Sequence, residues 1–183
     1  MRLVATEYLT VDGIFEEPGH WSRPYFGEEA QQFKLEELHA TDALLLGRVT
    51  YEGFAAAWPT MSDPVGFADK MNTMPKYVVG TTLGPHPWEG AKLLGREFLD
   101  EIKAMRSESG GDLLLSGSAQ VFDACHRAGL IDLYRFMVHP LILGTGRSLF
   151  DGTSPETPLR LVRQQGFQTG IVVLEYVRAP ATG

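Results

Sequence analysis

The chain has 183 residues, of which 44% are hydrophobic and 21% are charged. That apolar content is enough to bury a core, and the length suits one ordinary domain, so we expect a folded chain and exclude a disordered one. The formal net charge is −7 and the basic residues are scattered, which leaves no basic stripe to neutralise a nucleic-acid backbone. A small anionic ligand is still compatible with this charge, because one arginine beside a helix N-terminus can hold a phosphate.

Cysteine and histidine usage excludes further classes of site. Cys125 is the single cysteine, so no intrachain disulfide can form, and we expect it to be a buried, unreactive core residue. The five histidines form no short metal-ligand pattern, and no G-x-S-x-G motif is present, so we expect neither a metal site nor acyl transfer.

No targeting or membrane segment is visible in the sequence. The apolar stretch near the N-terminus is too short for a secretory signal, and no window approaches ~18 uninterrupted apolar residues. We therefore expect a cytoplasmic protein. We expect one domain over residues 1–178, followed by a frayed tail over residues 179–183.

The apolar pattern predicts alternating strands and helices. Short apolar runs predict buried strands at residues 3–11, 43–46, 77–79, 113–115 and 133–138. Apolar residues at three-to-four spacing predict helices at residues 28–39, 49–57, 98–109 and 119–128. The β-prone runs 159–164 and 171–177 flank a glycine-bounded turn and predict a closing antiparallel pair. The expected fold is α/β, with a mixed, mostly parallel sheet flanked by helices.

The first strand-to-helix turn of interest is centred on Gly47. This glycine ends an apolar strand and leads into a predicted helix, with Arg48 and Thr50 in its first turn. Free N–H groups at a helix start can face an anion, glycine permits close approach to the backbone, and a guanidinium group matches a phosphate. The alternative is an ordinary turn with a solvated arginine and a threonine cap.

A second turn repeats this arrangement after the strand at residues 113–115. Small and polar residues open the next predicted helix: Ser116, Gly117, Ser118, Ala119 and Gln120. A diphosphate can lie against the backbone amides of such a turn, whereas a serine-capped helix start is the alternative. Two turns of this kind in one parallel sheet favour a shared dinucleotide crevice over two unrelated caps.

These two turns, together with residues 10–13 and 139–150, resemble the RibD C-terminal domain family, which shares the dihydrofolate reductase fold. The resemblance spans about residues 2 to 178. It implies NADPH bound across the carboxyl ends of the strands, with Gly47, Arg48 and Thr50 near its phosphates and Arg48 pairing the 2′-phosphate.

Two further features are interpreted through the same resemblance. Similar reductases carry hydroxyl residues near the adenosine phosphate, where this chain has Thr81 and Thr82, although an ordinary loop explains these threonines as well. Dihydrofolate reductases usually have two adjacent glycines where this chain has Gly117 and Ser118, so we do not assume that family's cis peptide here.

The resemblance also points to two candidate catalytic carboxylates. Asp12 follows the first strand, where related reductases pass close to nicotinamide and substrate, although an Asp-Gly turn is the competing interpretation. Glu29 lies four residues before the pair Phe33 and Lys34, at the spacing of the family's helical acidic residue. A solvated first-turn carboxylate beside the helix dipole is the alternative for Glu29.

An aromatic group close by is a candidate substrate pocket. Trp21, Tyr25 and Phe26 could line such a pocket, or serve as a hydrophobic lid or core packing.

The implied activity is NADPH-dependent reduction of a small heterocyclic or carbonyl compound. A pterin, or the ribosylaminopyrimidine of riboflavin biosynthesis, 5-amino-6-(5-phosphoribosylamino)uracil, leads the substrate classes. The resemblance also implies a homodimer. A non-catalytic nucleotide-binding module is the alternative function.

Overall fold

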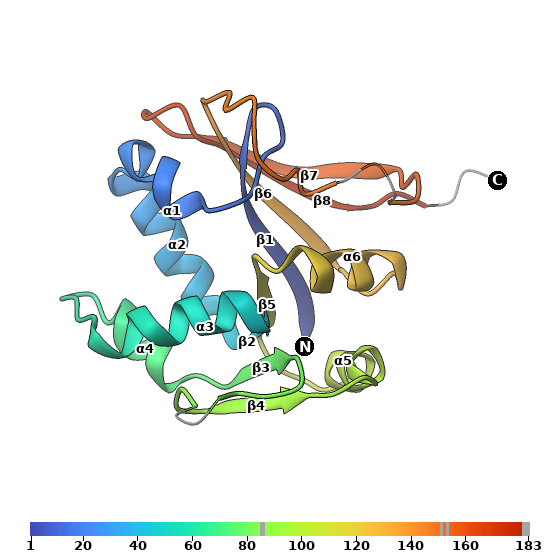
Figure 1. Cartoon of the computed structure of the whole chain (residues 1–183). Helices are drawn as coiled ribbons and strands as arrows, with labels where there is room; N and C mark the ends of the chain where they lie inside the picture. The colour runs from blue at the N-terminus through green and yellow to red at the C-terminus, as the bar shows by residue number, and fades with distance from the viewer. Residues whose placement is uncertain (85–86, 151, 153, 181–183) are drawn as a thin grey trace.

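The structure is a computed structural model that describes residues 1–84, 87–150, 152 and 154–180. Within these residues the strands form one eight-stranded sheet in the order β4-β3-β2-β5-β1-β6-β8-β7 (Figure 1). The strands are β1 (Arg2–Thr10), β2 (Thr41–Gly47), β3 (Lys76–Val79), β4 (Ala91–Leu94), β5 (Asp112–Ser116), β6 (Leu133–His139), β7 (Leu159–Gly166) and β8 (Val172–Arg178).

In the described part of the chain, six α-helices and two 3₁₀ turns accompany these strands. They are α1 (Pro18–Trp21), η1 (Arg23–Tyr25), α2 (Glu28–Ala40), α3 (Arg48–Ala57), η2 (Trp58–Thr60), α4 (Phe67–Thr73), α5 (Phe98–Arg106) and α6 (Ala119–Arg127). In Figure 1, α2, α3 and α4 lie on one side of the sheet and α5 and α6 lie on the other. The structure thus confirms the expected α/β fold with helices on both faces.

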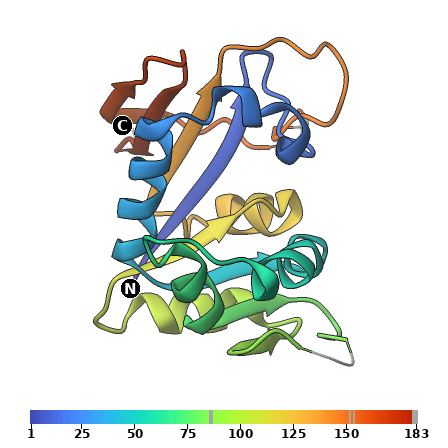
Figure 2. The same ribbon diagram turned by 90° about the vertical axis from the view of Figure 1, so that its left-hand side faces the viewer.

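Strand pairing changes from parallel to antiparallel at the C-terminal strands, as the sequence predicts. The strands from β4 to β6 pair in parallel, whereas β8 pairs antiparallel with both β6 and β7. Figure 2 shows β1 and β6 as the long adjacent strands in the middle of the molecule, with α2 running beside them. The predicted closing antiparallel pair is therefore confirmed.

The central strands are apolar on both faces because helices cover both faces. Leu45 is fully buried in the cluster that contains Ile102 of α5 and Phe122 of α6. Its neighbours Leu44 and Leu46 point to the opposite face and join the cluster that contains Tyr51 of α3. Successive strand residues alternate between faces, so one run of three leucines fills both cores.

The sequence did not predict α1, α4, β4 or the two 3₁₀ turns, and one helix is shorter than predicted. β4 and α4 are short, at 4 and 7 residues, so neither offers enough repeats for a periodic pattern. The helix predicted over residues 98–109 ends at Arg106. Residues 107–111 are serines and glycines around one glutamate, and such residues favour a turn over a helix.

The expected frayed tail lies mostly outside the description, because residues 181–183 are not among the described residues. Ala179, just before them, donates its backbone N–H to the carbonyl of Pro158 at 2.9 Å. No helix in the described ranges is both long enough and apolar enough to cross a bilayer.

Replacing Leu45 with alanine is expected to lower the free energy of unfolding by about 2–5 kcal/mol, because it leaves a cavity beneath both helices of its face. Urea denaturation measures the loss. Ile142, which is 70% exposed, is the matched control, and Ile142→Ala is expected to change stability by less than about 0.5 kcal/mol. Equal, small effects of both changes would contradict the placement of Leu45.

Candidate functional site

A cleft of about 1700 Å³ opens at the carboxyl ends of the central strands. Its walls come from the ends of β1, β2 and β5, from α2 and α3, and from the start of α6. Pockets for a single drug-sized ligand usually measure about 300–1,000 Å³, so this cleft has room for two ligands side by side. In open α/β sheets, ligands bind at this end of the strands.

The pairing of β2 with β5 brings the two predicted turns together. The strands run in parallel with Leu45 opposite Leu115, so they end side by side. The Gly47 N–H donates to Ser118 Oγ at 2.7 Å, and Ser118 Oγ donates to Thr50 Oγ1 at 2.9 Å. The two turns therefore form one hydrogen-bonded unit facing the cleft.

Backbone conformation explains the small residues of the second turn. Gly117 and Ser118 both have positive φ, +59° and +64°. A Cβ on Gly117 would lie 3.2 Å from Thr50 Oγ1, so only glycine fits this position without movement. Ser118 adopts the same uncommon region with its side chain held by Gly47 and Thr50. The described residues contain no cis peptide bond.

Both helix starts are open to an anion. α3 begins after Gly47 and α6 begins after Ser118, and no side chain caps either start. The first N–H groups of a helix have no partner within it, and the helix dipole adds positive potential at that end. A dinucleotide's phosphates fit this arrangement, because both starts line the same cleft.

Arg48 already has an acidic partner in the first turns of α3. Its Nη1 lies 2.8 Å and 2.9 Å from the two carboxylate oxygens of Glu52, and both side chains are about half exposed. Such an exposed pair on one helix is weak, about 0.3–0.5 kcal/mol, so a phosphate can compete for the guanidinium. Thr81 lines the cleft, whereas Thr82 does not and instead accepts a hydrogen bond from the Gly84 N–H at 3.1 Å.

Apolar side chains form the rim of the cleft on the α3 side. Val49, Met61 and Val65 are 72%, 49% and 58% exposed, and all three line it. Trp58 and Phe67 lie behind them with ring centroids 5.4 Å apart. Exposed apolar groups gathered at one cleft indicate a ligand with a flat, apolar part.

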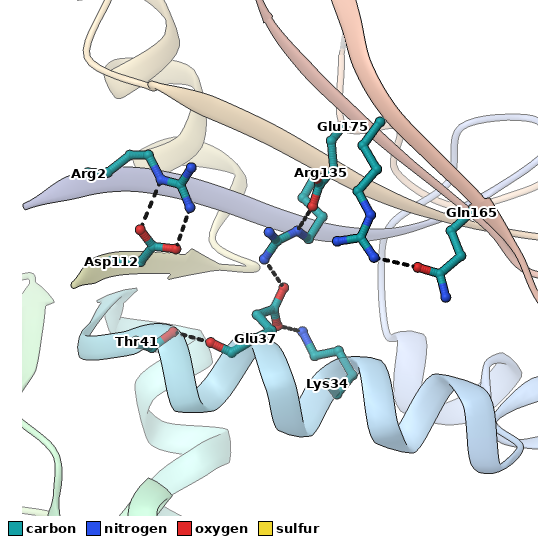
Figure 3. A network of polar contacts seen from close by, with 9 residues as sticks. Arg2, Lys34, Glu37, Thr41, Asp112, Arg135, Gln165 and Glu175 are labelled. Atoms are coloured by element: carbon teal, nitrogen blue, oxygen red, sulfur yellow. Dashed lines mark hydrogen bonds and ion pairs between the residues drawn. The ribbon is translucent and has the colours of Figure 1, made fainter.

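A buried charge network forms a charged wall beside the cleft, and Lys34 and Glu37 of this network line the cleft (Figure 3). Arg135 of β6 donates to Glu175 of β8 at 2.7 Å and to Glu37 of α2 at 2.9 Å, and Lys34 is ion-paired with Glu37. Burial, and then repulsion from Arg135, lower the pKa of Lys34. The four groups comprise two cations and two carboxylates, which gives the mutual pairing that buried charges require.

Glu7 of β1 is a fifth ionisable group at this wall. Its residue is 2% exposed and lines the cleft, and its Oε1 has no hydrogen-bond partner. Burial raises the pKa of Glu7 well above its ordinary value, although Lys34 and the Gly117 amide act in the opposite direction. Thr6, the preceding residue, also lines the cleft and also carries a buried oxygen without a partner.

The two carboxylates singled out in the sequence lie outside the cleft lining. Asp12 accepts hydrogen bonds from Thr10 Oγ1 at 2.5 Å and from the Gly144 amide at 2.8 Å, which lowers its pKa. Glu29 accepts one from the Gln168 amide at 2.6 Å. The contacts of Asp12 join two loops, and the contact of Glu29 joins a loop to α2. The catalytic roles of Asp12 and Glu29 stay predictions.

The three aromatic residues predicted for a pocket separate in the structure. Phe26 lines the cleft, whereas Trp21 and Tyr25 pack edge-on against the buried His139, with ring centroids 5.1 Å and 6.1 Å away. Burial lowers the pKa of His139. Trp21 and Tyr25 therefore support the loop that carries Phe26.

The sequence interpretation missed the charged wall. Glu7 stands alone as a charge in an apolar run, and that signal was available. Lys34 entered only as a spacing marker, and Glu37, Arg135 and Glu175 were not selected. Among the residues described, no cluster of three histidine, cysteine or acidic side chains has the geometry to hold a metal ion.

Comparison with known proteins places this geometry in context. Residues 2–173 match the RibD C-terminal domain family. A Bacillus subtilis (strain 168) protein, YyaP, which has no assigned role, is 26% identical over 142 residues, or 76% of this chain and 75% of that protein.

Two solved structures share the fold. A putative riboflavin biosynthesis protein from Shewanella sp. PV-4 superposes with a TM-score of 0.76 at 16% identity, covering 98% of this chain and all of that one. The dihydrofolate reductase of Enterococcus faecalis, solved with NADP(H), has a TM-score of 0.64 at 17% identity, covering 98% and 97%. The fold is thus dihydrofolate-reductase-like.

Replacing Glu7 with glutamine is expected to stabilise the protein increasingly as the pH rises. The pKa of Glu7 in the folded protein lies above its ordinary value of 4.5. The contribution of Glu7 to the free energy of unfolding is therefore fully present only below about pH 4.5. Its contribution is lost as the pH rises toward the folded-state pKa, whereas glutamine has no proton to lose. Urea denaturation of both proteins between about pH 4 and pH 8 measures the difference.

Glu36→Gln, which changes an exposed carboxylate on α2 outside the cleft lining, is the control. A stability difference between the wild type and Glu7→Gln that is constant across this pH range would show that Glu7 has an ordinary pKa.

Proposed function

Because the chain belongs to the RibD C-terminal domain family, we propose that it is an NADPH-dependent reductase acting on a small heterocyclic or carbonyl substrate. The observation that carries the proposal is the hydrogen-bonded unit of Gly47, Thr50 and Ser118, which aims two uncapped helix starts at one cleft. The fold shared with a dihydrofolate reductase solved with NADP(H) supports the choice of cofactor.

Each half of the cleft suits a different part of the reaction. The amides at the starts of α3 and α6, with Ser116, Ala119 and Gln120 nearby, would bind the cofactor's phosphates. Bound there, NADPH would supply a hydride to a carbon of the substrate. The charged wall on β1 and α2 would bind the polar edge of that substrate, and the apolar rim would cover its flat face.

The substrate classes that fit are flat or flexible compounds with a reducible C=N or C=O bond. A pterin and 5-amino-6-(5-phosphoribosylamino)uracil both meet this description. The riboflavin biosynthesis name of the Shewanella protein supports the second compound. The unpartnered oxygens of Thr6 and Glu7 would select a substrate with hydrogen-bonding groups on one edge, because an apolar ligand would leave them without partners.

We further propose a homodimer in the cytoplasm. β7 is one of the two edge strands of the described sheet, and Leu161 and Val162 on β7 and Val172 on β8 are about 40% exposed. Apolar side chains on an edge strand suit contact with a second copy.

Isothermal titration calorimetry with NADPH tests the proposal at its first step, with one saturable site expected. Oxidation of NADPH in the presence of a substrate then separates a reductase from a non-catalytic nucleotide-binding module. A folded protein that shows no saturable NADPH binding would contradict the proposed function.

Arg48→Ala is expected to weaken NADPH binding about ten- to hundredfold more than NADH binding, since a charge-assisted hydrogen bond contributes about 1.5–3 kcal/mol. Glu52→Gln is expected to tighten NADPH binding about twofold, because it frees the guanidinium from its partner. Calorimetry with both cofactors measures the ratio.

Lys103→Ala removes a similarly exposed cation from the pair with Asp100 on α5 and controls for net charge. Equal losses for NADPH and NADH in Arg48→Ala would assign Arg48 to the diphosphate or to the fold. No loss for either would place it in solvent.

A further inference from the structure

Glu7 lies where the sheet opens onto the cleft. The pairing of β1 with β5 ends at Thr6 opposite Ser116, whereas β1 continues to pair with β6, where Glu7 lies opposite Phe136. Glu7 is thus the first residue of β1 beyond the end of β5, at the point where the chain turns through Gly117 into α6. Glu7 and the starts of α3 and α6 line the same cleft, so a ligand that spans the cleft can contact both.

The surrounding charges leave Glu7 without a counter-ion of its own. Arg135 is shared by Glu37 and Glu175, and Lys34 is paired with Glu37. These four groups balance, so an ionised Glu7 would add an uncompensated negative charge to a buried wall. The remaining charged side chains lining the cleft are Glu16, Glu17, Glu28, Arg48, Asp63 and Arg147.

Lys34 nevertheless acts on Glu7 through space. Its positive charge lowers the pKa of Glu7, as the Gly117 amide also does, against the larger effect of burial. A carboxyl group in this setting holds a proton readily, and its carboxylate form is partly stabilised once the proton has left. Both properties are required of a group that donates a proton and later regains it.

We propose that Glu7 is the proton donor of the reaction, with its carboxyl O–H aimed at the nitrogen or oxygen of the substrate's reducible C=N or C=O bond. This inference rests on the proposed function and assigns the acid that it requires. Glu7 supplies only the proton, and neither the hydride nor its electrons come from this residue. As hydride from the reduced nicotinamide forms the new C–H bond, the π electron pair of the double bond moves to the heteroatom.

Glu7 would supply the proton that the reaction consumes. The heteroatom takes the proton, the O–H bond of Glu7 breaks, and a carboxylate remains near Lys34. The substrate would gain one hydride, which NADPH would supply, and one proton, and Glu7 would regain its proton from solvent before the next turnover.

Infrared spectroscopy of the ligand-free protein tests the first requirement. At neutral pH the wild type and the control variant Glu36→Gln are expected to show the C=O stretch of a protonated carboxylic acid. This band is expected to be absent from Glu7→Gln. No difference between wild type and Glu7→Gln would overturn the proposal, because an ionised Glu7 has no proton to donate.

Single-turnover kinetics test the second requirement, with 7,8-dihydrofolate and 5-amino-6-(5-phosphoribosylamino)uracil as probes. Glu7→Gln is expected to reduce the rate of the reductive step by about a hundredfold or more, with NADPH affinity within about twofold of wild type. The wild-type rate should fall as the pH rises through the pKa of Glu7, and this dependence should be lost in the variant. Asp12→Asn and Glu29→Gln compare the rival carboxylates.

The outcomes separate this inference from the proposed function. Turnover by Glu7→Gln at the wild-type rate, or loss of the pH dependence in Asp12→Asn or Glu29→Gln instead, would overturn the role of Glu7 and leave the reductase standing. No NADPH binding or no turnover by the wild type on either probe would overturn the reductase, whatever the infrared band shows.

Discussion

The parallel pairing of β2 with β5 is the constraint on which the site depends. With Leu45 opposite Leu115, both strands end at the same level, and Ser118 can accept from Gly47 while donating to Thr50. A shift of one residue would move the leucines between the two cores, so burial on both faces holds the register. Core packing thereby sets the spacing of the two helix starts, and the hydrogen bond between their N-cap residues Gly47 and Ser118 joins them.

The charged wall follows from a different constraint, the antiparallel turn-back of β8 onto β6. It places Glu175 directly opposite Arg135, and α2 then brings Glu37 and Lys34 over the same arginine. Buried ion pairs contribute little net stability relative to apolar residues of similar size, so function is a better reason for three of them among four residues beside a cleft. Burial at this wall raises the pKa of Glu7, and the positive charge of Lys34 partly opposes that effect.

Features that depend on neighbouring residues could be predicted from the sequence. The leucine run of β2, the glycine at its end and the small residues after β5 indicated both turns, because strand and turn signals lie within a few residues of one another. Arg135 and Glu175 are 40 residues apart, and periodicity does not pair them. The central position of β1, which buries Glu7, likewise depends on strand order. β4 and α4 are too short to show a periodic pattern in the sequence. The contacts of Asp12 and Glu29 with distant loops also leave no pattern in the neighbouring residues.

The starts of α3 and α6 are proposed to act as one phosphate site beside Glu7. Backbone amide chemical shifts, followed by NMR during titration with NADPH, test it most directly. We expect the largest shifts to occur together at Arg48, Val49 and Thr50 and at Ala119 and Gln120, with one shared affinity. Saturable binding with the largest shifts elsewhere, such as the shallow hollow lined by His39, Asp69 and Lys70, would contradict it. Shifts at only one of the two helix starts would contradict it as well.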